Sequence, residues 1–191
     1  ESDVKGLTLA EAESSILTYS NNDFAHLMLN YLGTDQEARE MYKQFSSQPD
    51  EYYDPDFIDY SYFSVRFMND VMTTLYSEPE RFPHIIDCLK LAQPDGYFHL
   101  SLDPSIVIAQ KYGSFDDQIG QSFNHTTGII YTPNPCIVTV MTCNVSNYEK
   151  VISDAALMLT EYSLSLDDQL KSYEEEKQAE EEAARKAEED G

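Results

Sequence analysis

The hydrophobic and polar positions of this chain follow two periods, and the change comes after the turn sequence Pro94-Asp95-Gly96. Before the turn, apolar residues recur at i, i+3, i+4 and i+7, the spacing that places them on one helix face. These stripes predict helices over residues 9–18, 24–32, 65–76 and 85–89. After the turn, β-branched runs predict strands over 106–111, 127–132 and 137–142, and a final helical stripe starts at Val151. Helices, three antiparallel strands and a terminal helix indicate an α+β fold.

Short polar signals mark where these elements begin and end. Thr8 and Glu11 have the spacing of a capping box, which starts the first helix, and Gly33 ends the second. Asn134-Pro135 predicts the turn between the last two strands. The four residues Tyr19 to Asn22 are therefore a tight loop between two helices.

Composition narrows the possible partners. The chain has 12 basic and 35 acidic residues, a net charge of −23, which argues against nucleic-acid phosphates and anionic membranes. No apolar run reaches the roughly 18 residues of a membrane span. We interpret the three cysteines, Cys88, Cys136 and Cys143, as buried or half-buried thiols. The histidines show no metal-ligand spacing, so no metal site is expected, and His26 is interpreted as a surface residue.

Two stretches lack a regular period. Residues 45–63 are acidic, aromatic and proline-containing, and we interpret them as a long surface loop. Residues 171–191 are rich in Glu, Ala and Lys without an apolar stripe, which predicts a fraying helix that does not dock. We therefore expect one domain over residues 1–165 and an acidic tail over residues 166–191.

The side chains that could carry chemistry gather at two predicted boundaries. The loop between the first two helices places the Ser20 hydroxyl and the amides of Asn21 and Asn22 on a short, anchored segment. Lys111 ends the first β-branched run, and Gly113 follows it at a point where backbone can approach a ligand closely. A serine, amides and a lysine on rigid supports suit the handling of an amide or peptide bond.

These segments, taken in order, resemble one family of enzymes. The loop Ser20-Asn21-Asn22 resembles the Ser-Asp-Asn segment of class A β-lactamases and related penicillin-recognising serine hydrolases. The run Lys111-Tyr112-Gly113-Ser114 looks like their Lys-Thr-Gly strand, and residues 128–131 and 137–142 are similar to the two strands that follow. Residues 64–68 resemble the helix start after the family's Ω-type loop. The resemblance covers residues 6–162 and implies a β-lactamase/transpeptidase-like antiparallel sheet flanked by helices.

The resemblance also implies a role for each matching residue. Ser20 would relay a proton to the leaving nitrogen, and Lys111 would polarise that hydroxyl and attract the substrate carboxylate. Asn22 would hold a substrate carbonyl, Gly113 would admit the substrate backbone, and Ser114 would hydrogen-bond to the carboxylate.

Three departures from the family pattern qualify these roles. Asn21 stands where the family has aspartate, which removes a charge that helps to organise the loop. Tyr112 stands where a small hydroxyl residue is usual, and its ring is expected to project into the cleft as part of the substrate-binding set. The five acids of the long loop do not form the family's Glu-x-x-Leu-Asn pattern; they are Asp50, Glu51, Asp54, Asp56 and Asp59. Without that deacylating glutamate, a penicillin-binding or peptidase-like relative is favoured over an efficient β-lactamase.

The family's nucleophile is the serine of a Ser-x-x-Lys motif. Here only Ser2-Asp3-Val4-Lys5 has this pattern, and Ser2 lies just 18 residues before Ser20, whereas the family places roughly 55–65 residues there. We therefore expect the nucleophile helix and the N-terminal strands to be absent from this chain. The sheet should then leave part of an apolar face exposed, with poor behaviour in isolation.

The implied function is acyl transfer by a bacterial serine hydrolase, extracellular or at the cell surface. Its substrates would be β-lactams or peptidoglycan stem peptides, without a cofactor or metal. Two alternatives remain: a catalytically inactive domain of the same fold that binds ligands at the cell surface, and an unrelated acidic interaction domain. The last is excluded if Ser20, Asn22 and Lys111 converge on one cleft.

Overall fold

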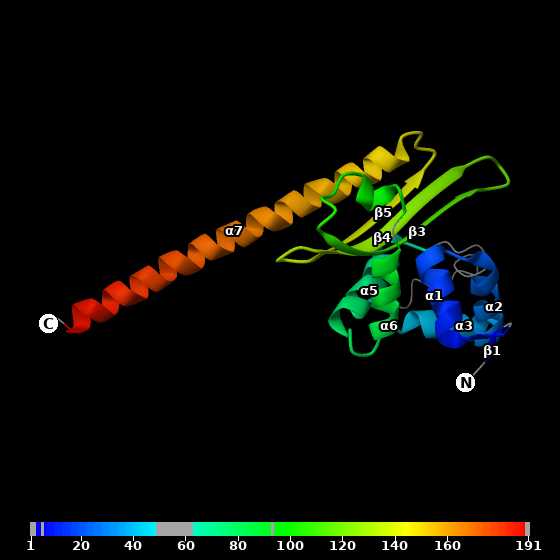
Figure 1. Cartoon of the computed structure of the whole chain (residues 1–191), viewed down its shortest axis with the longest axis horizontal. Coiled ribbons are helices and arrows are strands. Elements are labelled where there is room, and N and C mark those ends of the chain that lie inside the picture. The colour runs from blue at the N-terminus through cyan, green and yellow to red at the C-terminus, as the bar shows by residue number, and fades with distance from the viewer. Residues whose placement is uncertain (1–2, 5, 49–62, 93, 190–191) are drawn as a thin grey trace.

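The computed structural model describes residues 3–4, 6–48, 63–92 and 94–189. In chain order its elements are β1 (Asp3–Val4), β2 (Leu7–Thr8), α1 (Leu9–Tyr19), α2 (Asn22–Leu32), α3 (Asp35–Lys43), α5 (Val65–Ser77), α6 (Pro83–Leu91), the 3-10 helix η2 (Tyr97–Leu100), β3 (Val107–Asp116), β4 (Ser122–Tyr131), β5 (Cys136–Cys143) and α7 (Tyr148–Glu189). Figure 1 shows the three long strands as one sheet, with α7 extending away from it as a long rod. The predicted α+β order of helices, three antiparallel strands and a terminal helix is confirmed.

The sheet has β4 at its centre, between β3 and β5. The β3–β4 hairpin is longer than the sequence predicted, because antiparallel pairing continues from Lys111↔Thr127 outward to Asp116↔Ser122. Lys111 therefore lies in the middle of β3, and its predicted place at a strand end is wrong. The β-branched run stops before Lys111, so the outer half of the hairpin depends on cross-strand pairing that no local pattern shows.

Helices cover both faces of the sheet. One buried cluster joins the sheet to α7 and η2; its most deeply buried members are Phe98, Ile108, Ile130, Ile152 and Ala156. A second cluster joins the opposite face to α5 and α6 and includes Met72, Leu75, Ile86, Leu89, Ala109 and Ile129. Successive strand residues alternate between the two clusters, as the pleat of a strand requires.

Only part of the apolar stripe predicted for the terminal helix is buried. Ile152 and Ala156 are fully buried against the sheet, whereas Val151, Leu159 and Tyr162 are 40%, 38% and 60% exposed. The stripe is wider than the arc that one helix buries against one sheet face, so its outer part faces solvent. The helix continues unbroken to Glu189, and the division into a domain over 1–165 and an acidic tail over 166–191 stays a prediction.

Several smaller predictions are settled by the described residues. Cys88 is buried and Cys136 is half-buried, as interpreted, but Cys143 at the end of β5 is exposed, and all three thiols are free. The sequence patterns did not predict α3, which starts with a capping box between Thr34 and Glu37. Most of the predicted loop over 45–63, including its five acids, lies outside the described residues. No helix in the described part of the chain is long and apolar enough to cross a membrane.

Gln110 is a buried polar side chain that destabilises the fold. Its side chain is completely buried, and neither its amide nitrogen nor its amide oxygen has a hydrogen-bond partner among the described residues. Burying such a group without a partner costs about 1–3 kcal/mol. We expect Gln110→Met, which keeps the chain length and removes the amide, to raise the free energy of unfolding by about 1 kcal/mol. Urea unfolding measures this, and a less stable methionine variant would contradict it.

Candidate active site

Ser20 is fixed where α1 ends against α6. The buried Thr18 hydroxyl donates to the Cys88 carbonyl oxygen at 3.1 Å, and α6, which carries Cys88, packs on β3. Ser20 itself adopts the left-handed conformation, with φ 56° and ψ 42°, which costs a non-glycine residue about 1–2 kcal/mol. This strained turn stops α1 and brings the Ser20 hydroxyl to β3.

Asn21 organises the loop that follows. Its side-chain oxygen accepts a hydrogen bond from the Phe24 backbone N–H at 3.2 Å, as the N-cap of α2. Asparagine and aspartate are equally good N-caps. The substitution of asparagine for the family's aspartate therefore keeps the cap while removing the charge.

The cap gives a matched pair of variants. We expect Asn21→Ala to lower the free energy of unfolding by about 1 kcal/mol. Asn21→Asp should stay within a few tenths of a kcal/mol of the wild type, because a carboxylate also caps and is favoured at a helix N-terminus. Urea unfolding of both variants distinguishes them, and equal losses would show that the cap contributes nothing.

Lys111 contacts Ser20 directly, although 91 positions separate them in the chain. Its Nζ donates to the Ser20 Oγ at 2.7 Å and to the Tyr112 carbonyl oxygen at 2.8 Å. Burial lowers the pKa of Lys111, since its hydrogen bonds to the Ser20 hydroxyl and the Tyr112 carbonyl are to neutral oxygens that do not balance the charge. A lysine with a lowered pKa, hydrogen-bonded to a hydroxyl, exchanges protons with that hydroxyl more readily than an ordinary lysine does.

The residues after Lys111 alternate between the two faces of β3. Gly113 is on the Lys111 side, and a side chain there would meet nothing within 4 Å. Tyr112 is on the other side, where its ring packs on Tyr97 with 5.0 Å between ring centroids and joins the cluster under α7. The ring is therefore held back from the cleft into which the sequence projected it, because adjacent strand residues point to opposite faces. Ser114 shares the Tyr112 side, because it is two residues further along the strand.

The structure thus brings some of the predicted residues together and leaves others apart. Ser20 and Lys111 touch, and Tyr112 and Gly113 continue from Lys111 along the wall of one pocket. Asn22 is exposed in the first turn of α2. His26, one turn further along α2, is exposed as expected.

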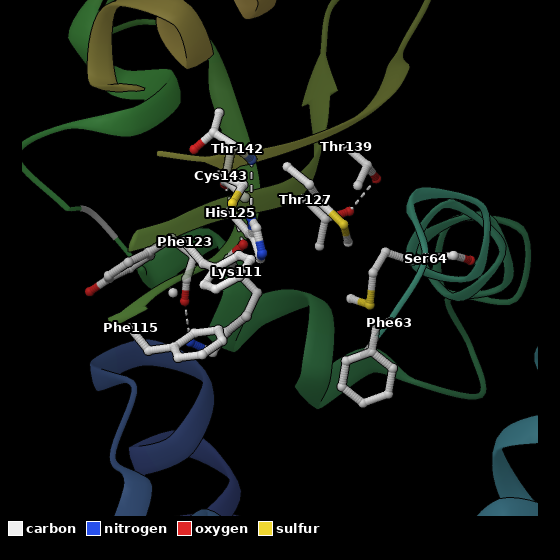
Figure 2. Close-up of a pocket in the computed structure, with 15 residues that line it drawn as sticks. Phe63, Ser64, Lys111, Phe115, Phe123, His125, Thr127, Thr139, Thr142 and Cys143 are labelled. Atoms are coloured by element: carbon white, nitrogen blue, oxygen red, sulfur yellow. Dashed lines mark hydrogen bonds between the residues drawn. The ribbon is translucent and has the colours of Figure 1, made fainter. Parts of the chain in front are cut away.

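A pocket of about 490 Å³ opens on the sheet face that carries Lys111 (Figure 2). Three cross-strand rows form its floor: Lys111–Thr127–Thr139, Gly113–His125–Met141 and Phe115–Phe123–Cys143. Phe63, Ser64 and Met68, at the start of α5, line it as well. Phe115 is 50% exposed, which fits the expectation of a partly uncovered apolar sheet face.

His125 is a pocket residue that the sequence did not select. Its Nδ1 accepts a hydrogen bond from the Thr142 backbone N–H at 3.2 Å, so in the neutral ring the proton is on Nε2. Its ring meets Phe123 edge-on, and Figure 2 shows it among the side chains of the pocket. The sequence does contain a pattern that could have identified His125, because Phe123, His125 and Thr127 lie at every second position and so share one strand face. That face is known to be the Lys111 face only once the hairpin register is known.

A comparison with protein families decides which fold this is. The model described as the beta-lactamase enzyme family matches residues 2–163. The chain belongs to the beta-lactamase enzyme family. The resemblance drawn from the sequence is therefore confirmed at the level of the family, whereas no curated protein matches the sequence.

Solved structures agree with this family membership at low identity. An ancestral Gram-negative (GNCA) class A beta-lactamase is 21% identical with a TM-score of 0.63, over 83% of this chain and 66% of that chain. A halotolerant bacterial beta-lactamase is 15% identical with a TM-score of 0.64, over 83% and 67%. The structure titled PBP-A is 16% identical with a TM-score of 0.58, over 80% and 60%. These similarities show the fold, and this beta-lactamase-family chain spans about two thirds or less of their length.

Proposed function

We propose that this chain forms part of a serine acyl-transfer site acting on β-lactams or peptidoglycan stem-peptide amides, with the attacking hydroxyl outside the 191 residues. The observation that carries this is the 2.7 Å contact between Lys111 Nζ and Ser20 Oγ. Burial lowers the pKa of Lys111 in that contact, which is typical of a lysine that exchanges protons. Such substrates lie outside the cytoplasmic membrane, so an extracellular or cell-surface bacterial location is expected.

The geometry supports separate proton-transfer roles for Ser20 and Lys111. When a serine oxygen bonds to the amide carbon, the carbon–nitrogen bond breaks and the leaving nitrogen needs a proton. Ser20 gives its hydroxyl proton to that nitrogen, and the ammonium of Lys111 replaces it across their hydrogen bond. The proton that leaves the attacking hydroxyl as its bond to carbon forms restores the Lys111 ammonium. Water then releases the acyl group as an acid. Asn22 and Gly113, with the backbone of Tyr112 and Ser114 on either side of Gly113, are the proposed substrate-binding residues.

A second function, a catalytically inactive binding domain, is favoured by one observation at the site. Tyr112 replaces the small hydroxyl residue of the family, and its ring lies against Tyr97. The Tyr112 ring, held against Tyr97, does not offer a small hydroxyl to a substrate carboxylate at that position. A domain that binds ligands without acylation would keep the Ser20–Lys111 contact as a structural hydrogen bond.

The 191-residue chain is expected to form no covalent adduct with a fluorescent penicillin. The reason is that its single Ser-x-x-Lys pattern, at Ser2, lies too near Ser20 in the chain. Intact-mass spectrometry checks this, with a penicillin-binding protein labelled in parallel as the positive control. A stoichiometric mass increase would contradict the expectation and point to Ser2.

The gene sequence on the 5′ side of the Glu1 codon separates the two functions. A Ser-x-x-Lys on an amphipathic helix roughly 55–65 residues before Ser20 supports the hydrolase, and the polypeptide that includes it should be labelled by the fluorescent penicillin. A reading frame without that serine, or an unlabelled product, supports the binding domain.

A further inference from the structure

Tyr97 has a backbone conformation that tyrosine rarely adopts. Its φ is +58°, in the left-handed region that favours glycine, yet the residue is only 8% exposed and belongs to the core cluster under α7. The neighbouring Gly96 has φ −131° and does not use that region. A bulky residue held in a strained conformation by its surroundings is a frequent feature of functional sites.

The Tyr97 side chain reaches the part of β3 that follows Lys111. Its ring packs on the Tyr112 ring in a tilted arrangement, with 5.0 Å between centroids and 36° between planes. The Tyr148 ring of α7 also lies near it, with 6.2 Å between centroids. Tyr97 therefore contacts the residue that directly follows Lys111.

Tyr112 in turn contacts Lys111 twice. Its carbonyl oxygen accepts a hydrogen bond from Lys111 Nζ at 2.8 Å, and its ring centroid lies 5.1 Å from the same nitrogen. The third contact of that nitrogen is the Ser20 hydroxyl. A continuous path of direct contacts thus runs from Tyr97 through Tyr112 and Lys111 to Ser20.

We propose that Tyr97 is a positioning residue for the Ser20–Lys111 pair: it clamps the Tyr112 ring over one side of Lys111 Nζ, keeps water from that side and holds the amine against Ser20. This rests on the proposed function of the pair. Tyr97 itself touches neither Ser20 nor substrate, so it acts only through Tyr112. A core residue without this role would affect folding stability and leave the Lys111 amine unchanged.

The pKa of Lys111 distinguishes these two roles. It can be measured in the 191-residue chain by NMR of lysines labelled with ¹³C at Cε, with Lys111→Arg to assign the signal. Tyr97→Leu removes the stacked ring, so water reaches the amine, and the pKa of Lys111 is expected to rise by about half a unit or more toward its ordinary value. Tyr97→Phe keeps the ring and should leave the pKa within about 0.2 units of the wild type.

Tyr148→Leu is the matched control, because Tyr148 also lies against Tyr97 within the same cluster. It should destabilise the fold without moving the pKa of Lys111. If Tyr97→Leu does not fold, Tyr112→Leu removes the other ring of the stack and should produce the same rise. An unchanged pKa of Lys111 in folded Tyr97→Leu, or an equal rise in Tyr148→Leu, would overturn the positioning role of Tyr97. Neither result would affect the proposed function of the Ser20–Lys111 pair. An ordinary lysine pKa in the wild type would overturn the proposed function of the pair.

Discussion

Replacing Phe98 with alanine is expected to lower the free energy of unfolding by about 3–5 kcal/mol, the range for large aromatic residues removed from a core. Phe98 is completely buried between the sheet and α7, where Ile108, Ile130 and Ile152 pack in the same cluster. Strands and a helix fix this space on both sides, so it cannot close around a methyl group. Because small domains unfold with about 5–15 kcal/mol in total, this loss is a large fraction of the stability. Urea unfolding followed by circular dichroism measures it.

Phe115→Ala provides the comparison within the same residue type. Phe115 is 50% exposed on the outer half of the β3–β4 hairpin, and its main contact is the stacked ring of Phe123 at 4.8 Å. Its removal should cost about 1 kcal/mol, the size of one aromatic pair plus partial burial. Equal losses for Phe98→Ala and Phe115→Ala would show that the cluster under α7 does not dominate the stability.

The sequence correctly predicted the helices and strands that are determined by their own local pattern of apolar, β-branched and capping residues. α1 starts where the Thr8–Glu11 capping box places it, and α2 covers the stripe that Gly33 ends. β5 covers the predicted β-branched run with one added residue at each end. In each case, local propensity, apolar period and terminal signals agree, so no distant contact has to override them.

The differences arise where a distant segment decides the structure. The outer half of β3 contains Gly113 and a charged end, and it becomes strand only because residues 122–126 pair with it. The outer stripe of α7 is helical and apolar as predicted, but the three-stranded sheet offers it only one surface to pack against. Whether an apolar helix residue is buried therefore depends on the surface that packs against the helix as well as on the apolar stripe itself.

The candidate site also combines residues that the sequence identified with residues that it did not. The resemblance to a family selected Ser20 and Lys111 from segments far apart in the chain, and the fold places Lys111 Nζ 2.7 Å from Ser20 Oγ. Tyr97 has no motif, and its position follows from a left-handed backbone that the sequence gives no reason to expect. Residues that hold a site in place are specified by tertiary contacts, so a single sequence identifies them less readily than the reacting groups.

Lys111→Met is expected to stabilise the protein at neutral pH by about 1–2 kcal/mol, less than the full range for buried charges because Lys111 is only half-buried. The burial that lowers the pKa of Lys111 destabilises its charged form, and a hydroxyl and a carbonyl compensate only in part. An apolar chain of similar length removes that cost. The same change removes the amine from Ser20, so stability should rise while the proposed chemistry is lost.

The pH dependence of this gain has a defined sign. Below the lowered pKa of Lys111 the folded and unfolded chains both carry the proton, and the cost of the buried charge is fully present. Between that pKa and the ordinary value of 10.5, only the unfolded chain binds the proton, so the wild-type free energy of unfolding rises with pH relative to Lys111→Met. The gain should therefore be larger at pH 7 than at pH 10, while the exposed control Lys150→Met changes stability by less than about 0.5 kcal/mol. A variant less stable than the wild type at pH 7, or a gain that does not shrink by pH 10, would show that the Lys111 charge costs the fold nothing.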